Sequence, residues 1–317
     1  MTLVDGRYAA LDIGTVTCRL LVADVEGGRV CEVAKEYAIT DLGVGVDASG
    51  RLSEEAMERV LSTVDRYRAT LERCDTAAHP VRRLIAMATS AARDAANADE
   101  FARRLADHGV TLTVIPGWRE AALSFVGAAA DFPDENLLVV DIGGGSTEIV
   151  AGRAGLPPVA SHSFNVGCRR VTERFCHADP PTALELSEAR QWIHAEMAPF
   201  FRDLRERGFA VDRLVAVAGT ATSVVAVREA MEVYDSARVH KAHVSADELR
   251  AIEVRLATET LEQRRGTVGL DPKRAGVIVA GLVILEEVLA LAGVDGYTVS
   301  ESDILHGMIL EAAGRDA

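Results

Sequence analysis

The chain has 317 residues, of which 49% are hydrophobic, and carries a formal net charge of −14. Its length favours two domains of about 150 residues each, and its negative charge argues against a nucleic-acid binder, which presents a basic face. No apolar run reaches the roughly 18 residues that a membrane span needs, and the N-terminus lacks the pattern of a signal peptide. The five cysteines are scattered without C-x-x-C spacing. We therefore expect a cytoplasmic protein that binds neither nucleic acid nor membrane.

Strands and helices alternate along the chain, which is the pattern of an α/β fold. Residues 1 to about 45 predict a strand meander, and Ser53 is placed to cap a helix that runs to about Cys74. The later elements are expected, in order, as a strand at 84–88, helix 97–106, strand 111–115, helix 118–130, strands between 148 and 163, helix 182–207, strand 214–217, helices to about 292, strand 297–300 and helix 303–313. The polar stretch 131–136 contains a proline and is the predicted hinge between two domains.

A short aspartate and glycine motif occurs twice, each time between two apolar runs. The first copy is Asp12-Ile13-Gly14-Thr15, and the second is Asp141-Ile142-Gly143-Gly144-Gly145-Ser146-Thr147. The flanking runs predict that each copy lies at the tip of a β-hairpin. Glycine there permits positive φ and close approach of backbone N–H groups to an anion, and the aspartate adds an oxygen ligand for Mg²⁺. The alternative reading is a pair of ordinary tight turns.

Three further segments carry polar groups at the ends of predicted strands. Residues 218–223 (Ala-Gly-Thr-Ala-Thr-Ser) follow one strand and open a helix, which predicts free amides or simply a close-packed helix start. Residues 88–94 place Arg93 just beyond another strand. The planar guanidinium group of an arginine can donate hydrogen bonds to two phosphate oxygens at once. Glu120 falls in the first turn of a helix, where it is either a functional carboxylate or a partner of the helix dipole. Basic residues that could hold a polyanion are Arg19, Arg93, Arg169, Arg170, Lys273 and Arg274.

Taken together, these segments resemble the exopolyphosphatase and guanosine pentaphosphate phosphohydrolase (Ppx/GppA) family, within the sugar kinase, Hsp70 and actin superfamily. The matching motifs are residues 12–19, 88–94 (A-T-S-A-x-R-D), 117–121, 141–148 (D-I-G-G-G-S-T-E) and 218–223. The resemblance extends from about residue 7 to about 312. It implies two ribonuclease-H-like α/β domains with a cleft between them, domain I being residues 1–130 plus about 300–317 and domain II residues 131–299.

The resemblance also implies a role for each matched residue. Glu120 would be the general base, and Asp141 and Glu148 would be catalytic carboxylates that organise Mg²⁺, with Asp12 as a further metal ligand. The phosphate-binding residues would be Asp12, Gly14, Thr15, Thr17, Arg19, Arg93, Gly143, Gly144, Gly145, Ser146, Thr147, Gly219 and Thr220. Water attack on a terminal phosphoryl group requires such positioning, charge neutralisation and a base. The expected cofactor is Mg²⁺, with Mn²⁺ as an alternative.

Three positions depart from the family pattern. Val16 stands where asparagine is usual, Arg119 replaces the first acid of an acidic pair, and Gly276 stands where aspartate is common. Arg119 is expected to add a positive charge beside the presumed base Glu120.

The resemblance predicts a metal-dependent exopolyphosphatase that acts on inorganic polyphosphate. The chain has no counterpart of the extra helical domains of longer members, so short polyphosphates are the expected substrates. Guanosine pentaphosphate is the alternative substrate, and a non-hydrolysing polyphosphate or nucleotide sensor is the alternative outside the enzyme class. The family also leads us to expect a homodimer.

Overall fold

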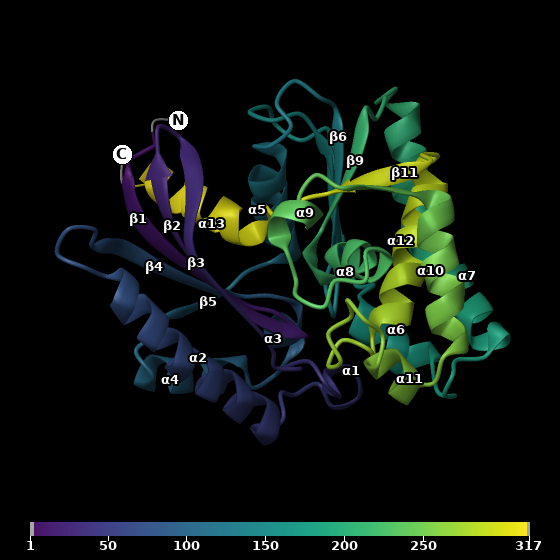
Figure 1. Ribbon diagram of the computed structural model, residues 1–317, viewed down its shortest axis with the longest axis horizontal. Helices are drawn as coiled ribbons and strands as arrows, with labels where there is room; N and C mark the ends of the chain where they lie inside the picture. The colour runs from purple at the N-terminus through teal and green to yellow at the C-terminus, as the bar shows by residue number, and fades with distance from the viewer. Residues whose placement is uncertain (1–2, 316–317) are drawn as a thin grey trace. The chain divides into compact units, whose positions relative to one another are not determined.

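The computed structural model describes residues 3–315 and divides the chain into two compact units (Figure 1). Unit 1 comprises residues 1–127 and 302–317, and unit 2 comprises residues 128–301. The first crossing lies inside helix α5 (Gly117–Ala129), three residues before the expected boundary, and the second follows Glu301. Residues 1, 2, 316 and 317, which the expected first domain includes, lie outside the described residues.

Unit 1 is built on a five-stranded sheet in the order β3-β2-β1-β4-β5. The strands are β1 (Gly6–Ile13), β2 (Thr17–Glu26), β3 (Arg29–Ile39), β4 (Val81–Ala88) and β5 (Leu112–Val114). The first three form the expected antiparallel meander, whereas β4 and β5 run parallel to β1. The carboxyl ends of β1, β4 and β5 therefore lie at one edge of this sheet, where ligand-binding loops of α/β folds gather.

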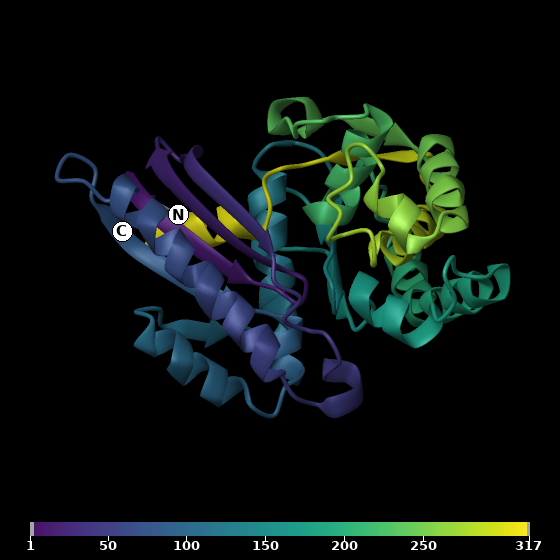
Figure 2. The same cartoon turned by 60° about the horizontal axis from the view of Figure 1, so that its bottom comes forward.

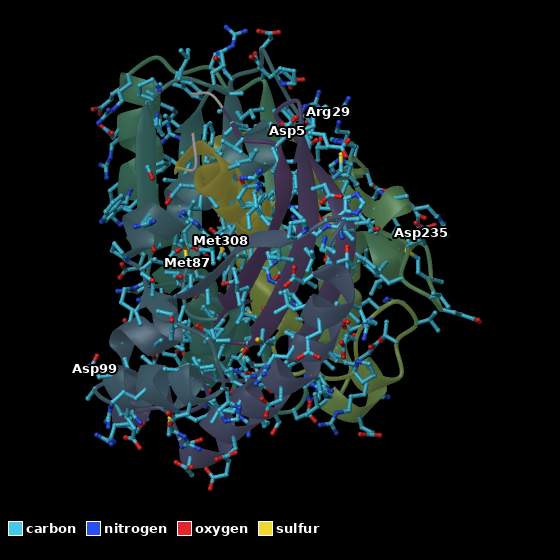
Figure 3. All side chains as sticks on the ribbon, turned by 90° about the vertical axis from the view of Figure 1, so that its left-hand side faces the viewer. Asp5, Arg29, Met87, Asp99, Asp235 and Met308 are labelled. Atoms are coloured by element: carbon cyan, nitrogen blue, oxygen red, sulfur yellow. The ribbon has the colours of Figure 1, made fainter. Side chains whose placement is uncertain are left out.

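Helices cover both faces of this sheet. Alternate residues of β1 such as Leu11 pack toward helix α2 (Glu54–Cys74) and α4 (Ala98–Asp107), the side visible in Figure 2. The residues between them, such as Tyr8, pack toward helix α13 (Ile304–Arg315) and α5. Figure 3 shows Met87 of β4 close to Met308 of α13 in this second core cluster. Two short helices complete the unit, α1 (Val46–Ser49) and α3 (Ser90–Asp94).

Unit 2 contains a six-stranded sheet in the order β10-β11-β9-β6-β7-β8. Its strands are β6 (Leu137–Ile142), β7 (Thr147–Gly152), β8 (Ala160–Phe164), β9 (Arg213–Val217), β10 (His243–Ser245) and β11 (Gly296–Val299). Strands β6 to β8 form an antiparallel meander, and β9 and β11 run parallel in succession beside β6. Five of these strands thus repeat the arrangement of unit 1, with β10 added at the edge.

The helices of unit 2 surround the apolar helix α12 (Ile278–Ala292). Its residues are buried almost throughout. The other helices are α6 (Cys168–Phe175), α7 (Ala183–Glu206), α8 (Ala218–Arg228), α9 (Ser236–Val239), α10 (Ala246–Thr258) and α11 (Leu261–Arg265). Capping boxes begin α7, α10 and α11, so these helix starts are specified by the local sequence.

Most predicted elements are confirmed within a few residues, including both hairpins and the α2 cap, where the Ser53 side chain accepts from the Ala56 amide. Two expectations for unit 2 were wrong. The segment 218–292 was expected to be helical, yet it contains the edge strand β10, whose three residues are too few for a clear alternating pattern. Helix α6 was not predicted, because it is short and highly charged. None of the helices over residues 3–315 has the length and apolarity that a membrane crossing demands.

Candidate active site

The first aspartate-glycine loop joins β1 to β2 and leaves backbone donors available. The Gly14 amide donates to the Thr17 carbonyl at 2.8 Å, which closes the loop. No hydrogen bond to another described residue involves the amides of Thr15 or Val16. Gly14 does not have a positive φ, so that part of the expectation was wrong. Glycine is favoured instead because a Cβ would lie 3.2 Å from the Thr17 carbonyl oxygen.

Asp12 and Arg19 face each other across the β1–β2 pair, two residues from either end of this loop. The Arg19 Nε and Nη2 atoms donate to Asp12 Oδ2 at 3.1 and 2.6 Å, and Nη1 donates to Asp303 at the start of α13. Asp12 Oδ1 is buried without a hydrogen-bond partner among the described residues. Sequence reasoning missed Asp303, because its only local signal is that of a helix cap.

Asp12 and Asp303 share one guanidinium, and their pKa values shift in opposite directions. Burial raises the pKa of Asp12, and Arg19 offsets only part of that effect. Burial acts on Asp303 too, but Arg19, Lys35, His306 and the Leu305 amide outweigh it and lower the pKa of Asp303. The cluster thus holds one cation between two buried carboxyl groups, and Asp12 is the one less well stabilised as an anion.

Glu120 and Arg93 meet at the ends of β4 and β5. Arg93 belongs to α3, which follows β4, and Glu120 lies in the first turn of α5. Arg93 Nη1 donates to Glu120 Oε2 at 3.1 Å and to the Ile115 carbonyl at 3.0 Å. The ion pair fixes a largely buried carboxylate in one orientation. The neighbouring Arg119 instead pairs with Glu311 of α13 at 2.7 Å, so the expectation that its charge would act on Glu120 requires correction.

The second loop joins β6 to β7 and repeats the closing bond of the first. The Gly143 amide donates to the Ser146 carbonyl at 2.9 Å, and the amides of Gly144, Gly145 and Ser146 make no hydrogen bond to another described residue. The expectation of positive φ at Gly143, Gly144 and Gly145 was also wrong. Thr147 lies inside the fold, where its hydroxyl donates to the Val166 carbonyl.

The N-terminus of α6 holds the carbonyl side of this second loop. The Cys168 amide donates to the Gly143 carbonyl at 2.9 Å, and the Arg169 and Arg170 amides donate to the Gly144 carbonyl at 2.8 and 3.2 Å. A Cβ on Gly167 would overlap the Gly144–Gly145 backbone, so glycine is required for this approach. Since the carbonyls of Gly143 and Gly144 face α6, the loop amides are left for another acceptor, as a phosphate site requires.

Asp141 and Glu148 lie directly opposite each other on β6 and β7. Glu148 in turn lies opposite Ser163 of β8, whose hydroxyl donates to Glu148 Oε1 at 2.6 Å. Directly paired residues share one face of a sheet with Cβ atoms roughly 5 Å apart. Asp141 is 7% exposed and Glu148 1%, so two carboxylates share a buried position, which favours a cation between them.

The carboxylates of Asp141 and Glu148 could supply two of the ligands of a Mg²⁺ ion, but not a complete set. Over residues 3–315, no cluster of three or more His, Cys, Asp and Glu side chains could hold a metal ion. Mg²⁺ is usually bound by one or two carboxylates, with waters and substrate phosphates in its other positions. Asp141 and Glu148 meet that requirement. Asp12 contributes less, because its Oδ2 atom accepts from Arg19.

The start of α8 lies beside the second loop, because β9 and β6 are parallel neighbours. No side chain caps this helix, and Ala218 has a φ of 64°, which strains a residue other than glycine. The Arg274 guanidinium packs on Gly219, where a Cβ would overlap it. The Thr220 side chain contacts Gly281 of α12 instead of the helix start, so only its backbone amide remains a candidate for phosphate binding.

Comparisons with known proteins agree on one family. A model described as the Ppx/GppA phosphatase family matches residues 21–316. Exopolyphosphatase 2 of Mycobacterium tuberculosis is 39% identical, over 97% of this chain and 99% of that protein. The crystal structure of an exopolyphosphatase from Cytophaga hutchinsonii has a TM-score of 0.87 at 26% identity, covering 98% of each chain. The Aquifex aeolicus Ppx/GppA family member has a TM-score of 0.80 at 28% identity, covering 98% of this chain and 99% of the other.

Proposed function

Because this chain belongs to the Ppx/GppA phosphatase family, we propose that it is an exopolyphosphatase, which hydrolyses the terminal phosphate of inorganic polyphosphate and releases orthophosphate. One observation carries the proposal: the relative named Exopolyphosphatase 2 is 39% identical over almost the full length of both chains. The two loops with free amides are suited to such a substrate, because polyphosphate offers anionic oxygens along its whole length.

Glu120 is the proposed general base. Its carboxylate is held by Arg93, which leaves it oriented to take a proton from the attacking water. The amides of residues 15 and 16 in unit 1 and of residues 144–146 in unit 2 are proposed to bind phosphate oxygens. Arg274 and the start of α8 add positive charge at the same edge of the unit 2 sheet.

Asp141 and Glu148 are proposed to hold Mg²⁺, with Ser163 orienting Glu148. A bound Mg²⁺ ion would neutralise charge on the phosphate oxygens during transfer. Mn²⁺ has similar oxygen ligands and is the alternative.

The substrate range, the metal and the assembly state can be tested together. Orthophosphate release is measured from polyphosphates of defined length and from guanosine pentaphosphate, each with Mg²⁺ and with Mn²⁺. We expect the fastest release from short polyphosphates. A preference for guanosine pentaphosphate would reassign the substrate, and binding without release under every condition would indicate a sensor. Light scattering tests the proposed homodimer, and cell fractionation tests the proposed cytoplasmic location.

A further inference from the structure

Asp303 lies in the buried charge cluster beside the first loop, and the proposed reaction gives it no role. It contacts Arg19 Nη1, whereas Asp12 accepts from Nε and Nη2 of the same guanidinium. One carboxylate would suffice to neutralise Arg19. Together the two carboxylates engage all three guanidinium nitrogens. Residues 19 and 303 are 284 positions apart in the sequence, so this contact is made only by the fold.

We propose that Asp303 is a positioning residue that holds Arg19 away from the first loop and thereby weakens the binding of free orthophosphate there. The inference rests on the proposed assignment of loop 14–16 to phosphate binding. An arginine whose nitrogens already contact carboxylates must give up those contacts before it can bind another anion. For an enzyme that releases orthophosphate, weak binding of this product favours turnover.

Asp303 is fixed firmly enough to act in this way. Its Oδ1 accepts from the Leu305 amide at 2.9 Å, which caps α13, and its own amide donates to His306 Nδ1 at 3.4 Å. Its carbonyl packs so closely on α5 that a Cβ on Gly127 would overlap it. The carboxylate therefore cannot follow Arg19 if the arginine moves toward a phosphate, and the contact is either kept or broken.

The directions of the pKa shifts agree with this arrangement. The pKa of Asp303 is lowered, because Arg19 and the neighbouring donors outweigh burial. The pKa of Asp12 is raised by burial in spite of Arg19. Asp303 is therefore the better stabilised anion of the two, through Arg19 together with Lys35, His306 and the Leu305 amide.

The test replaces Asp303 with asparagine, which keeps the size of the side chain and an oxygen that caps a helix. Titration calorimetry with inorganic phosphate should show a Kd about tenfold lower than in the parent protein, the scale expected from freeing one charge-assisted donor. The competitive inhibition constant of orthophosphate should fall equally. Asp24→Asn is the matched control, because Asp24 pairs with Arg7 at 2.7 Å on the same two strands, at the far end from the loop. It should leave phosphate affinity unchanged.

Two further variants keep the proposal falsifiable. Asp303→Ser retains a capping hydroxyl but is too short to reach Arg19, so it should also bind phosphate more tightly. In an Arg19→Gln background, Asp303→Asn should change the phosphate Kd less than twofold. Unchanged or weaker phosphate binding in both Asp303 variants would overturn the proposal, as would a tenfold effect that persists without Arg19. Phosphate binding requires no turnover, so a parent protein that releases no phosphate would refute the proposed function while this comparison still stands.

Discussion

At the scale of single residues, the proposed chemistry depends on carboxylates that each have a defined partner. Glu120 is oriented by Arg93, Glu148 by Ser163, and Asp12 by Arg19. Asp12 and Asp141 occupy equivalent positions in their hairpins, but Asp12 faces an arginine across the strands and Asp141 faces a glutamate. In the unit 1 hairpin, the aspartate therefore faces a cation across the strands. In the unit 2 hairpin, two carboxylates lie side by side. This contrast is why we propose that a metal ion would bind in unit 2.

Glu120→Gln should lower kcat by roughly 100-fold or more with little change in KM, because glutamine keeps the shape of the side chain but cannot accept the proton of water. Steady-state kinetics at saturating polyphosphate and metal provide the measurement. Glu54→Gln is the control, since Glu54 also lies in the first turn of a helix and pairs with an arginine, Arg104. If kcat of Glu120→Gln stayed within a few-fold of the parent value, Glu120 would be only a partner of the helix dipole.

Asp141→Asn should weaken metal binding as well as turnover, because a metal-holding carboxylate acts before and during the reaction. Direct Mn²⁺ binding, followed by electron paramagnetic resonance, should show a loss of affinity, and the Mg²⁺ concentration for half-maximal activity should rise. Glu135→Gln serves as the comparison, because Glu135 precedes the same strand and pairs with Arg213 at 2.7 Å. Equal metal affinity in the parent and Asp141→Asn proteins would contradict the assignment.

The candidate site was only partly predictable at this scale. The loops, Arg93 and Glu120 could be placed because each follows an apolar run that predicts a strand. Asp303 could not be connected to Arg19, because hydrophobic periodicity says nothing about which distant segments meet. The reason given for glycine was also wrong, since a loop can need glycine for close approach, as at Gly143, without positive φ.

At the scale of elements, two helix starts lie against the second loop, which is proposed to bind phosphate. Helix α6 donates its first amides to the carbonyls of the second loop, and α8 begins beside the same loop under the Arg274 guanidinium. The α8 start was visible in the sequence as a run of small residues after a strand. Arg274, which packs on this helix start, was named only among several basic residues. The segment that carries Arg274 lies some fifty positions further along the chain, so the sequence pattern did not connect the two.

Gly219→Ala should raise KM for polyphosphate roughly tenfold, the cost of displacing one charge-assisted donor. The new methyl group would push the Arg274 guanidinium off the helix start. The thermal midpoint should change little, because the far end of an arginine side chain can move. Gly276→Ala is a matched control, since its nearest contact would be Leu261 at 4.0 Å. A normal KM for Gly219→Ala would show that Arg274 has no part in substrate binding.

The helix layer of unit 2 contains a crowded set of acids, and this gives a pH prediction. Arg190 of α7 pairs with Glu253 of α10 and with Glu286 and Glu287 of α12. Burial raises the pKa of Glu253 above its ordinary value of 4.5, and Arg190 offsets part of this. A raised carboxyl pKa means that the folded protein binds the proton more tightly, so the stability from this group is present below pH 4.5 and is lost as pH rises through the folded pKa.

Glu253→Gln should therefore be more stable than the parent at pH 8, and the difference should shrink as the pH approaches 4.5. Arg190 remains paired with Glu286 and Glu287 in the variant, so no lone buried charge is created. Denaturant unfolding at several pH values gives the comparison, with the exposed Glu188 of α7 as the control position. A stability difference that did not grow with pH would show that Arg190 compensates fully for the burial of Glu253.

At the scale of the whole molecule, one arrangement of strands occurs twice. The order β3-β2-β1-β4-β5 in unit 1 corresponds to β8-β7-β6-β9-β11 in unit 2, each with three antiparallel and two parallel strands. This is the two-domain α/β fold of the sugar kinase, Hsp70 and actin superfamily that the resemblance implied, and the similar family structures confirm it. The repeated loop motif marked the duplication in the sequence. Strand β10 has no counterpart in the sheet of unit 1, so the repeated motif gave no reason to expect it.

Unit 1 is discontinuous, and this leads to a prediction about its stability. Its second core cluster depends on α13, which supplies Ile304, Leu305, Met308 and Ile309 to the sheet face that carries Tyr8 and Met87. Burying four such side chains contributes up to about 6–12 kcal/mol, which is comparable to the whole stability of a typical domain, about 5–15 kcal/mol.

A chain truncated after Glu301 should therefore lose the fold of unit 1 and keep that of unit 2, whose described sheet lies entirely before the cut. Hydrogen exchange should become fast across β1 to β5 and stay slow in β6 and β9, and limited proteolysis should leave a fragment near residues 128–301. Deleting only residues 314–317 keeps every member of the core cluster and should leave exchange in β1 unchanged. If the chain cut after Glu301 still protected β1 and β4, α2 and α4 would be sufficient to hold the sheet, and α13 would serve chiefly to place Asp303 against Arg19.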